Sequence, residues 1–179
     1  MTEYDAVVYD LDGTLVRLDV DWDAVATAAR TVYRRAGEDP PAADSWELLT
    51  AADRIGRREE IDARIAEHER AGARSSTRLP LAADVPDRSV PVGVCSLNCE
   101  AACRIALERH DMLDDVDTIV GRDTVASMKP DPEPLLAAVD ELPGSPGDVL
   151  FVGDSASDEL TADRAGVAFR YVEEQIERM

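Results

Sequence analysis

A single lysine, Lys129, stands out in a chain whose other 18 basic residues are all arginine. It lies in the segment Ser-Met-Lys-Pro-Asp-Pro (127–132), between two acidic segments, Asp-Leu-Asp-Gly-Thr (10–14) and Gly-Asp-Ser-Ala-Ser-Asp (153–158). A planar guanidinium cannot imitate the compact ammonium of lysine on its flexible stem. A chemical role therefore explains this residue better than chance survival does. Carboxylates, a metal that they could hold and one lysine form a set suited to handling phosphate.

Short apolar runs predict the strands that would position these residues. The runs lie at 6–9, 90–95, 117–120, 149–152 and 167–172. Their apolar residues are continuous rather than alternating, which is typical of strands covered on both faces.

Helical spacing of apolar residues follows the later strands, at 99–107, 132–142 and 157–165. Asp131 is expected to cap the second of these helices, with Pro132 at its first position. Gly166 is expected to end the third. Strands that alternate with helices predict an α/β fold, with a Rossmann-like parallel sheet and helices on both faces.

Residues from about 20 to 75 interrupt this alternation. Helical stripes lie at 22–33, 48–55 and 61–65, and no strand pattern accompanies them. At 179 residues the chain fits one domain with an insertion. We therefore expect a core formed by 1–16 and 80–179, and a small all-α insertion after the first strand at 17–79.

Each chemical segment falls where a predicted strand ends. Asp10 ends the first strand, Ser96 follows the second, Lys129 comes after the third and Asp154 follows the fourth. Ligands of open α/β sheets bind beyond the carboxyl ends of the strands. The sequence therefore predicts that these four polar groups meet at one edge of the sheet.

The aspartates of this set predict a metal. Asp10 and Asp12 lie close together at a strand end, and with Asp154 and Asp158 they would repel one another without a cation. Mg²⁺ prefers such oxygen ligands, usually one or two carboxylates together with phosphate. Alone, residues 10–14 would equally suit a turn or a calcium-type loop, but the other three segments favour the catalytic reading.

In these segments the chain resembles the haloacid dehalogenase superfamily of hydrolases, in its phosphatase branch with a small helical cap. The resemblance rests on residues 10–14, on Val-Cys-Ser-Leu-Asn (94–98), on Lys129 with Pro130, and on residues 153–158. These motifs occur in the family's order and span the core. The insertion is similar in position to the family's first type of cap.

The resemblance implies a Mg²⁺-dependent phosphatase that acts through an aspartyl-phosphate. Asp10 is the expected nucleophile and Asp12 the expected acid and base. The metal ligands are expected to be the Asp10 and Asp154 carboxylates and the Asp12 backbone carbonyl. Ser96, Lys129, Gly13 and Thr14 are expected to bind the phosphoryl group.

The remaining positions refine this expectation. Asp158 is expected to orient Lys129 or a water on the metal. The family's dehalogenases lack an aspartate at position 12 and use no metal, so Asp12 favours phosphate transfer. The second motif reads Ser-Leu-Asn, where the family more often has Asn directly after Ser or Thr. Contact of Asn98 with ligand therefore stays open.

Three other classes of protein use similar residues. A phosphorylated receiver domain is disfavoured, because there the acidic pair and the phosphorylated aspartate lie on different strands. A sugar-phosphate mutase on the same scaffold stays open, and a bisphosphate requirement would reveal it. A non-catalytic acidic binding module also stays open, although every catalytic position is filled.

The net charge of −19 is extreme for this length, and the acidic residues are dispersed. A halophilic surface is the favoured explanation, since molar salt screens self-repulsion; the alternative is an acidic protein from a GC-rich genome.

Nucleic acid is an unfavourable partner because no basic stripe exists. Residues 1–5 predict no signal peptide, and no segment is apolar enough to span a membrane. We expect a cytoplasmic monomer or weak dimer whose partner is a small phosphorylated substrate.

The three cysteines, Cys95, Cys99 and Cys103, are spaced by four residues. This spacing matches no zinc motif. Cys99 and Cys103 lie on the apolar face of the helix predicted at 99–107, so we expect buried free thiols.

Overall fold

A parallel sheet forms the centre of the computed structural model, which describes residues 4–178. Its strand order is β5-β4-β1-β6-β7, and neighbouring strands pair in parallel throughout. The strands are β1 (Ala6–Tyr9), β4 (Val92–Cys95), β5 (Thr118–Val120), β6 (Val149–Gly153) and β7 (Ala168–Tyr171). The α/β fold, the parallel sheet and the five predicted strands are confirmed. The start of the chain at 1–3, where no signal peptide is predicted, and residue 179 lie outside the described residues.

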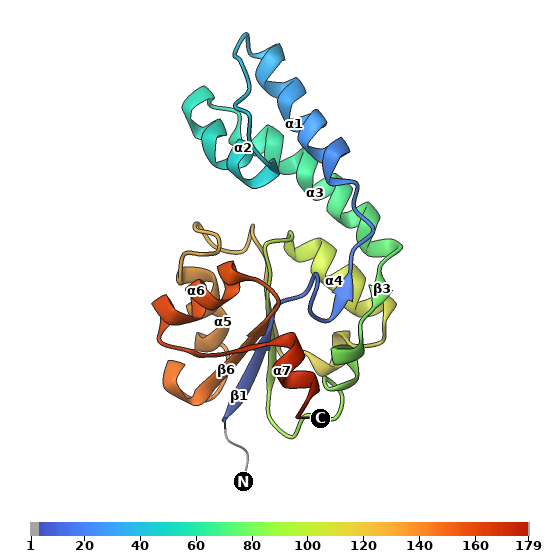
Figure 1. Cartoon of the computed structure of the whole chain (residues 1–179), viewed down its shortest axis with the longest axis vertical. Coiled ribbons are helices and arrows are strands. Elements are labelled where there is room, and N and C mark those ends of the chain that lie inside the picture. Colours follow the sequence, from blue (N-terminus) through green and yellow to red (C-terminus); the bar gives the residue numbers. More distant parts are fainter. Residues whose placement is uncertain (1–3, 179) are drawn as a thin grey trace.

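Helices cover both faces of this sheet, as predicted (Figure 1). They are α4 (Glu100–Arg109), α5 (Glu133–Asp140), α6 (Ala156–Ala165) and α7 (Val172–Ile176). Successive strand residues point to opposite faces. Val7 and Tyr9 therefore pack into the core that includes α4, whereas Ala6 and Val8 pack against α5 and α6.

The helical insertion lies over the carboxyl ends of the strands (Figure 1). It consists of α1 (Trp22–Arg35), α2 (Ser45–Ala51) and α3 (Arg58–Arg74). It has a hydrophobic core of its own, to which each helix contributes: Val25 from α1, Leu48 from α2 and Ile61 from α3. We call residues 17–79 the cap.

A short antiparallel ribbon joins the cap to the core. It pairs β2 (Val16–Arg17) with β3 (Thr77–Arg78), and the boundaries that we predict for the cap lie in it or next to it. Strands of two residues are too short to show alternation, so this ribbon could not be predicted. The remaining elements are four single turns of 3₁₀ helix: η1 (Ala52–Ile55), η2 (Pro80–Ala83), η3 (Leu113–Asp115) and η4 (Pro146–Asp148).

Each of the three helices predicted after the later strands begins one residue away from its predicted start. Helix α6 begins at Ala156, one residue early. Helix α5 begins at Glu133, and its N-cap is Pro132 rather than Asp131. The Asp131 carboxylate still accepts from the Glu133 N–H at 2.9 Å, which is the kind of contact expected of a capping aspartate. Helix α4 begins at Glu100, which makes Cys99 its N-cap rather than a residue of its apolar face.

The cysteine prediction is otherwise confirmed, because all three are buried free thiols. Burial raises the pKa of the Cys95 thiol to about 12 and that of Cys99 to about 11. None of the helices in the described range 4–178 is both long and apolar enough to cross a bilayer.

Candidate active site

A cleft of about 250 Å³ lies at the carboxyl edge of the sheet, under the cap. The core contributes Asp10, Asp12, Ser96, Asn98, Lys129, Asp154, Ser155 and Asp158 to its lining. The cap contributes Trp22 and Trp46. Residues that are far apart in the sequence therefore meet at one place, because the four predicted strand ends share one edge of the sheet.

Asp10 is the buried centre of this cleft, with 5% of its surface exposed. Its backbone N–H continues the pairing with β6 by donating to the Val152 carbonyl at 2.8 Å. The Lys129 ammonium donates to its Oδ1 at 2.8 Å, and the Thr14 hydroxyl donates to its Oδ2 at 3.3 Å. Burial raises the pKa of the Asp10 carboxyl above its ordinary value, and the Lys129 charge opposes that rise.

Lys129 is held by three oxygen atoms. Its Nζ contacts Asp10, forms a short ion pair with Asp158, and donates to the Cys95 carbonyl at 3.2 Å. Burial lowers the pKa of Lys129, but Asp10 and Asp158 outweigh it and hold the pKa well above the ordinary value. The lysine therefore carries a fixed positive charge beside the carboxylate of Asp10.

Asp158 is positioned by the start of helix α6. The Ser155 N–H donates to its Oδ2 at 3.2 Å, and the Asp158 N–H donates to Ser155 Oγ at 3.2 Å in return, which forms a reciprocal capping box. The Ser155 hydroxyl also donates to Oδ2, at 2.6 Å, so Oδ1 is left for Lys129. This contact fits the first of the two roles expected for Asp158, which stays a prediction.

Asp12 lies in the tight loop after β1. Its Oδ1 accepts from the Leu18 N–H at 2.9 Å, and the Gly13 N–H donates to the Val16 carbonyl at 2.8 Å. Burial raises the pKa of Asp12, while the Leu18 N–H lowers it and Asp154 raises it further. A raised pKa suits a carboxyl group that first gives up a proton and then takes one back.

Gly13 and Thr14 follow Asp10 in the chain but are not part of the cleft lining. Thr14 is fully buried and contacts Asp10. Gly13 has a φ of +92°, and a Cβ at this position would lie 2.1 Å from Asp154 Oδ2. The lack of a side chain at position 13 therefore leaves room for the Asp154 carboxylate. Phosphate binding by Gly13 and Thr14 stays a prediction.

The carboxylates fit a hard divalent cation. Oxygen atoms of Asp10, Asp154 and Asp158 lie within 4.8 Å of one another. Both carboxylate oxygens of Asp158 are in short contacts, with Lys129 and with Ser155. The Oδ2 of Asp10 has only the 3.3 Å contact with Thr14. Asp10 and Asp154 would therefore be the carboxylates that hold the cation. An all-oxygen donor set of this kind suits Mg²⁺.

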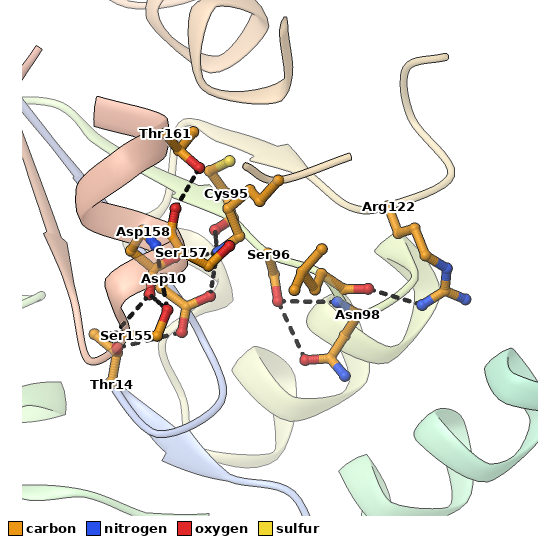
Figure 2. A network of polar contacts seen from close by, with 12 residues as sticks. Asp10, Thr14, Cys95, Ser96, Asn98, Arg122, Ser155, Ser157, Asp158 and Thr161 are labelled. Carbon is orange, nitrogen blue, oxygen red and sulfur yellow. Dashed lines mark hydrogen bonds and ion pairs between the residues drawn. The ribbon is translucent and has the colours of Figure 1, made fainter. Parts of the chain in front are cut away.

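Ser96 and Asn98 form the opposite wall of the cleft (Figure 2). Ser96 follows β4, and its N–H continues the pairing with β5 by donating to the Val120 carbonyl at 2.9 Å. The Ser96 hydroxyl donates to Asn98 Oδ1 at 3.1 Å, and the Asn98 N–H donates to Ser96 Oγ at 3.2 Å. The residue between them, Leu97, does not prevent Asn98 from reaching the cleft.

The sequence did not single out the contributions of the cap and of residue 122. Trp22 and Trp46 are the chain's two tryptophans, and their rings lie 5.4 Å apart in the cleft wall. Arg122 stacks on Trp46, with its Cζ 5.2 Å from the ring centre. Both tryptophans lie in the predicted cap, Trp22 in a predicted helix and Trp46 two residues before one, so their rarity was the available signal. For Arg122 the available signal was its place two residues after the end of β5.

The fold and the cleft together define a phosphate-handling α/β enzyme with a helical cap. A family model described as haloacid dehalogenase-like hydrolase matches residues 83–172. The phosphoglycolate phosphatase of Rhodospirillum rubrum is 33% identical to this chain over 186 residues, which cover 90% of the chain and 76% of that protein. The chain belongs to the haloacid dehalogenase-like hydrolases.

Other relatives agree with this assignment. A phosphoglycolate phosphatase of Cereibacter sphaeroides is 31% identical, over 91% of this chain and 82% of that protein. The crystal structure of a HAD-superfamily hydrolase, subfamily IA, from Geobacter sulfurreducens shares the fold with a TM-score of 0.65 at 22% identity, covering 98% of this chain and 100% of that one. The predictions of this family and of a phosphoric monoester hydrolase are confirmed.

Proposed function

We propose that this enzyme is a Mg²⁺-dependent phosphatase that hydrolyses a small-molecule phosphate monoester through an aspartyl-phosphate on Asp10. One observation carries the proposal: the Asp10 carboxylate is buried at the base of the cleft, 2.8 Å from the fixed charge of Lys129 and close to Asp154. A carboxylate held in this way is a competent covalent nucleophile.

The first step forms a bond from an Asp10 oxygen to phosphorus and breaks the ester bond to the leaving group. Bound by the Asp10 and Asp154 carboxylates and the Asp12 carbonyl, Mg²⁺ would neutralise charge so that one anion can approach another. Lys129 and Ser96 hold oxygen atoms of the phosphoryl group, and positioning of this kind supplies most of phosphoryl-transfer catalysis.

Asp12 moves the protons in both steps. It protonates the oxygen of the departing alcohol, a role that the raised pKa of its carboxyl favours. It then takes a proton from the water that attacks phosphorus. The bond between phosphorus and Asp10 breaks, which releases phosphate and restores the carboxylate.

The cleft favours a small substrate. Its volume of about 250 Å³ lies below the roughly 300–1,000 Å³ typical of ligand pockets. The two sequence relatives described above are named phosphoglycolate phosphatases. Phosphoglycolate is therefore the first substrate to test.

Turnover of a panel of phosphate esters, led by phosphoglycolate, tests this proposal. We expect Mg²⁺-dependent release of phosphate from at least one small ester, with loss of activity in EDTA and recovery when Mg²⁺ is restored. Equal activity with and without EDTA would exclude a requirement for Mg²⁺ in turnover. A requirement for a bisphosphate activator, with the product an isomer of the substrate, would indicate a mutase instead.

A further inference from the structure

A buried carboxylate of the cap reaches into the core beside the cleft. Glu69 belongs to cap helix α3, yet it is 0% exposed. Its Oε1 accepts from Asn98 Nδ2 at 3.3 Å, and its Oε2 accepts from the Cys99 N–H at 3.0 Å. Both donors belong to the core segment that follows Ser96, so the cap holds this segment directly.

Arg122 joins the same contact from the core side. Its Nη1 donates to Glu69 Oε1 at 2.6 Å and to the Leu97 carbonyl at 2.7 Å, and its Nε donates to Asp62 Oδ1 at 2.8 Å. Asp62 also belongs to α3. Arg122 therefore ties the cap helix and the segment after Ser96 to one guanidinium, as Figure 2 shows in part.

The network ends at the predicted phosphate-binding hydroxyl. Because Glu69 holds the Nδ2 of Asn98, the Oδ1 of that side chain faces Ser96 and accepts from its hydroxyl. The Asn98 N–H fixes the Ser96 oxygen from the other side. The hydroxyl hydrogen can still rotate from Asn98 to a phosphoryl oxygen, because only its oxygen is held in place.

We propose that Glu69 and Arg122 are positioning residues for Ser96, so that the phosphate site is complete only when the cap is docked on the core. This inference rests on the proposed function, since it needs Ser96 to hold the phosphoryl group. Docking of α3 brings in the carboxylate that aligns Asn98, and Asn98 aligns Ser96. Cap position and phosphate affinity are thereby linked.

The ion pair between Glu69 and Arg122 is not optimised for stability alone. A buried carboxylate is costly unless it is paired, which explains why Glu69 and Arg122 occur together. However, Arg122 Nη2 is buried and finds no hydrogen-bond partner among residues 4–178. A buried donor left unsatisfied is unfavourable and points to a functional reason for keeping arginine here.

Replacement of Glu69 by glutamine tests the inference with little change in size. One acceptor oxygen becomes an NH₂ group that faces the donors of Asn98, Cys99 or Arg122. Misplacement of a catalytic contact by 1 Å can cost on the order of 100-fold, and we expect kcat of Glu69→Gln to fall about 10- to 100-fold. The dissociation constant of inorganic phosphate, measured by calorimetry with Mg²⁺, should rise as well.

Glu67→Gln is the matched control. Glu67 lies on the same helix and pairs with Arg64 at 3.5 Å, but 67% of its side chain is exposed. It should match wild type in kcat and in phosphate affinity. Loss of folded protein alone would lower apparent kcat in Glu69→Gln and leave the dissociation constant of phosphate unchanged.

A double-mutant cycle with Ser96→Ala separates positioning from a purely structural role. Coupled residues give non-additive effects. We expect Glu69→Gln to weaken phosphate binding in the wild-type background and to change it less than about 3-fold once Ser96 is alanine. An equal loss in both backgrounds, or none in either, would overturn the inference.

A second variant covers the case in which Glu69→Gln does not fold. Arg122→Lys keeps the charge but loses the forked contacts to Glu69, Leu97 and Asp62, and the exposed Arg104→Lys is its control. We expect Arg122→Lys to weaken phosphate binding when Ser96 is present and to have little effect once Ser96 is alanine. An Arg122→Lys enzyme with wild-type phosphate affinity would contradict the inference. Failure of the proposed function would look different, because wild type would then hydrolyse no ester whatever these variants bind.

Discussion

Lys129 carries its charge in a buried place among three oxygen atoms. Its Nζ contacts oxygen atoms of Asp10, Asp158 and Cys95, and it is buried. We expect Lys129→Arg to lower kcat/KM on the order of 100-fold, because a flat guanidinium would displace the phosphoryl group. Steady-state kinetics measure this, with exposed Arg104→Lys as the control. Activity within a few-fold of wild type would mean that the charge alone is needed.

Position 13 has no space for any side chain. A Cβ there would overlap Asp154 Oδ2 at 2.1 Å, and φ is +92°. We expect Gly13→Ala to displace Asp154, to weaken Mg²⁺ binding in calorimetry and to remove most activity. Gly147→Ala is the control, since a Cβ at Gly147 meets nothing within 4 Å. Unchanged Mg²⁺ affinity in Gly13→Ala would show that Asp154 is not a ligand.

Cap helices α1 and α2 place both tryptophans of the chain in the wall of the cleft. Their fluorescence therefore reports on the site. We expect inorganic phosphate with Mg²⁺ to change the tryptophan emission in wild type, and Trp46→Phe to lose most of this change. Titration in a fluorimeter measures it. An emission that stays constant while calorimetry detects binding would show that ligand leaves the cap wall unaltered.

At the scale of elements, the strands were predictable and the cap contacts were not. Apolar residues dominate each strand of the sheet, and Asp10, Ser96 and Asp154 follow strands directly, so their meeting at one edge follows from parallel topology. Glu69 contacts Arg122 across 53 positions in the sequence. Arg122 lies two residues after β5, but Glu69 lies within a cap helix. No periodicity encodes such a pair, because it depends on how the cap docks.

The helix boundaries also include some that could be predicted from the sequence and some that could not. The Ser155 and Asp158 capping box was not predicted, although Gly166 was placed correctly as the αL end of α6. Glycine after a helical run is a strong local signal. By contrast, the N-cap of α5 is Pro132 rather than Asp131, although the Asp131 carboxylate accepts from the Glu133 N–H.

At the scale of the whole molecule, a net charge of −19 surrounds a site meant for an anion. At 0.01 M salt the Debye length is about 30 Å, so this field would repel substrate well before contact. Lys129 acts at short range, as a cation held by the carboxylates would, and salt screens such buried charges less. We therefore expect KCl from about 0.05 to 3 M to lower KM and raise the unfolding temperature, with little change in kcat. If both KM and stability are best at the lowest salt, the halophilic interpretation is wrong.

Covalent phosphate on Asp10 is the most direct test of the proposed mechanism. Enzyme mixed with a turned-over ester and Mg²⁺ is quenched in acid, and its peptides are analysed by mass spectrometry. We predict the mass of one phosphoryl group on the peptide that contains Asp10, and neither phosphate nor turnover in a folded Asp10→Asn variant. Comparable turnover in Asp10→Asn and wild type, or phosphate on a different residue, would contradict the mechanism.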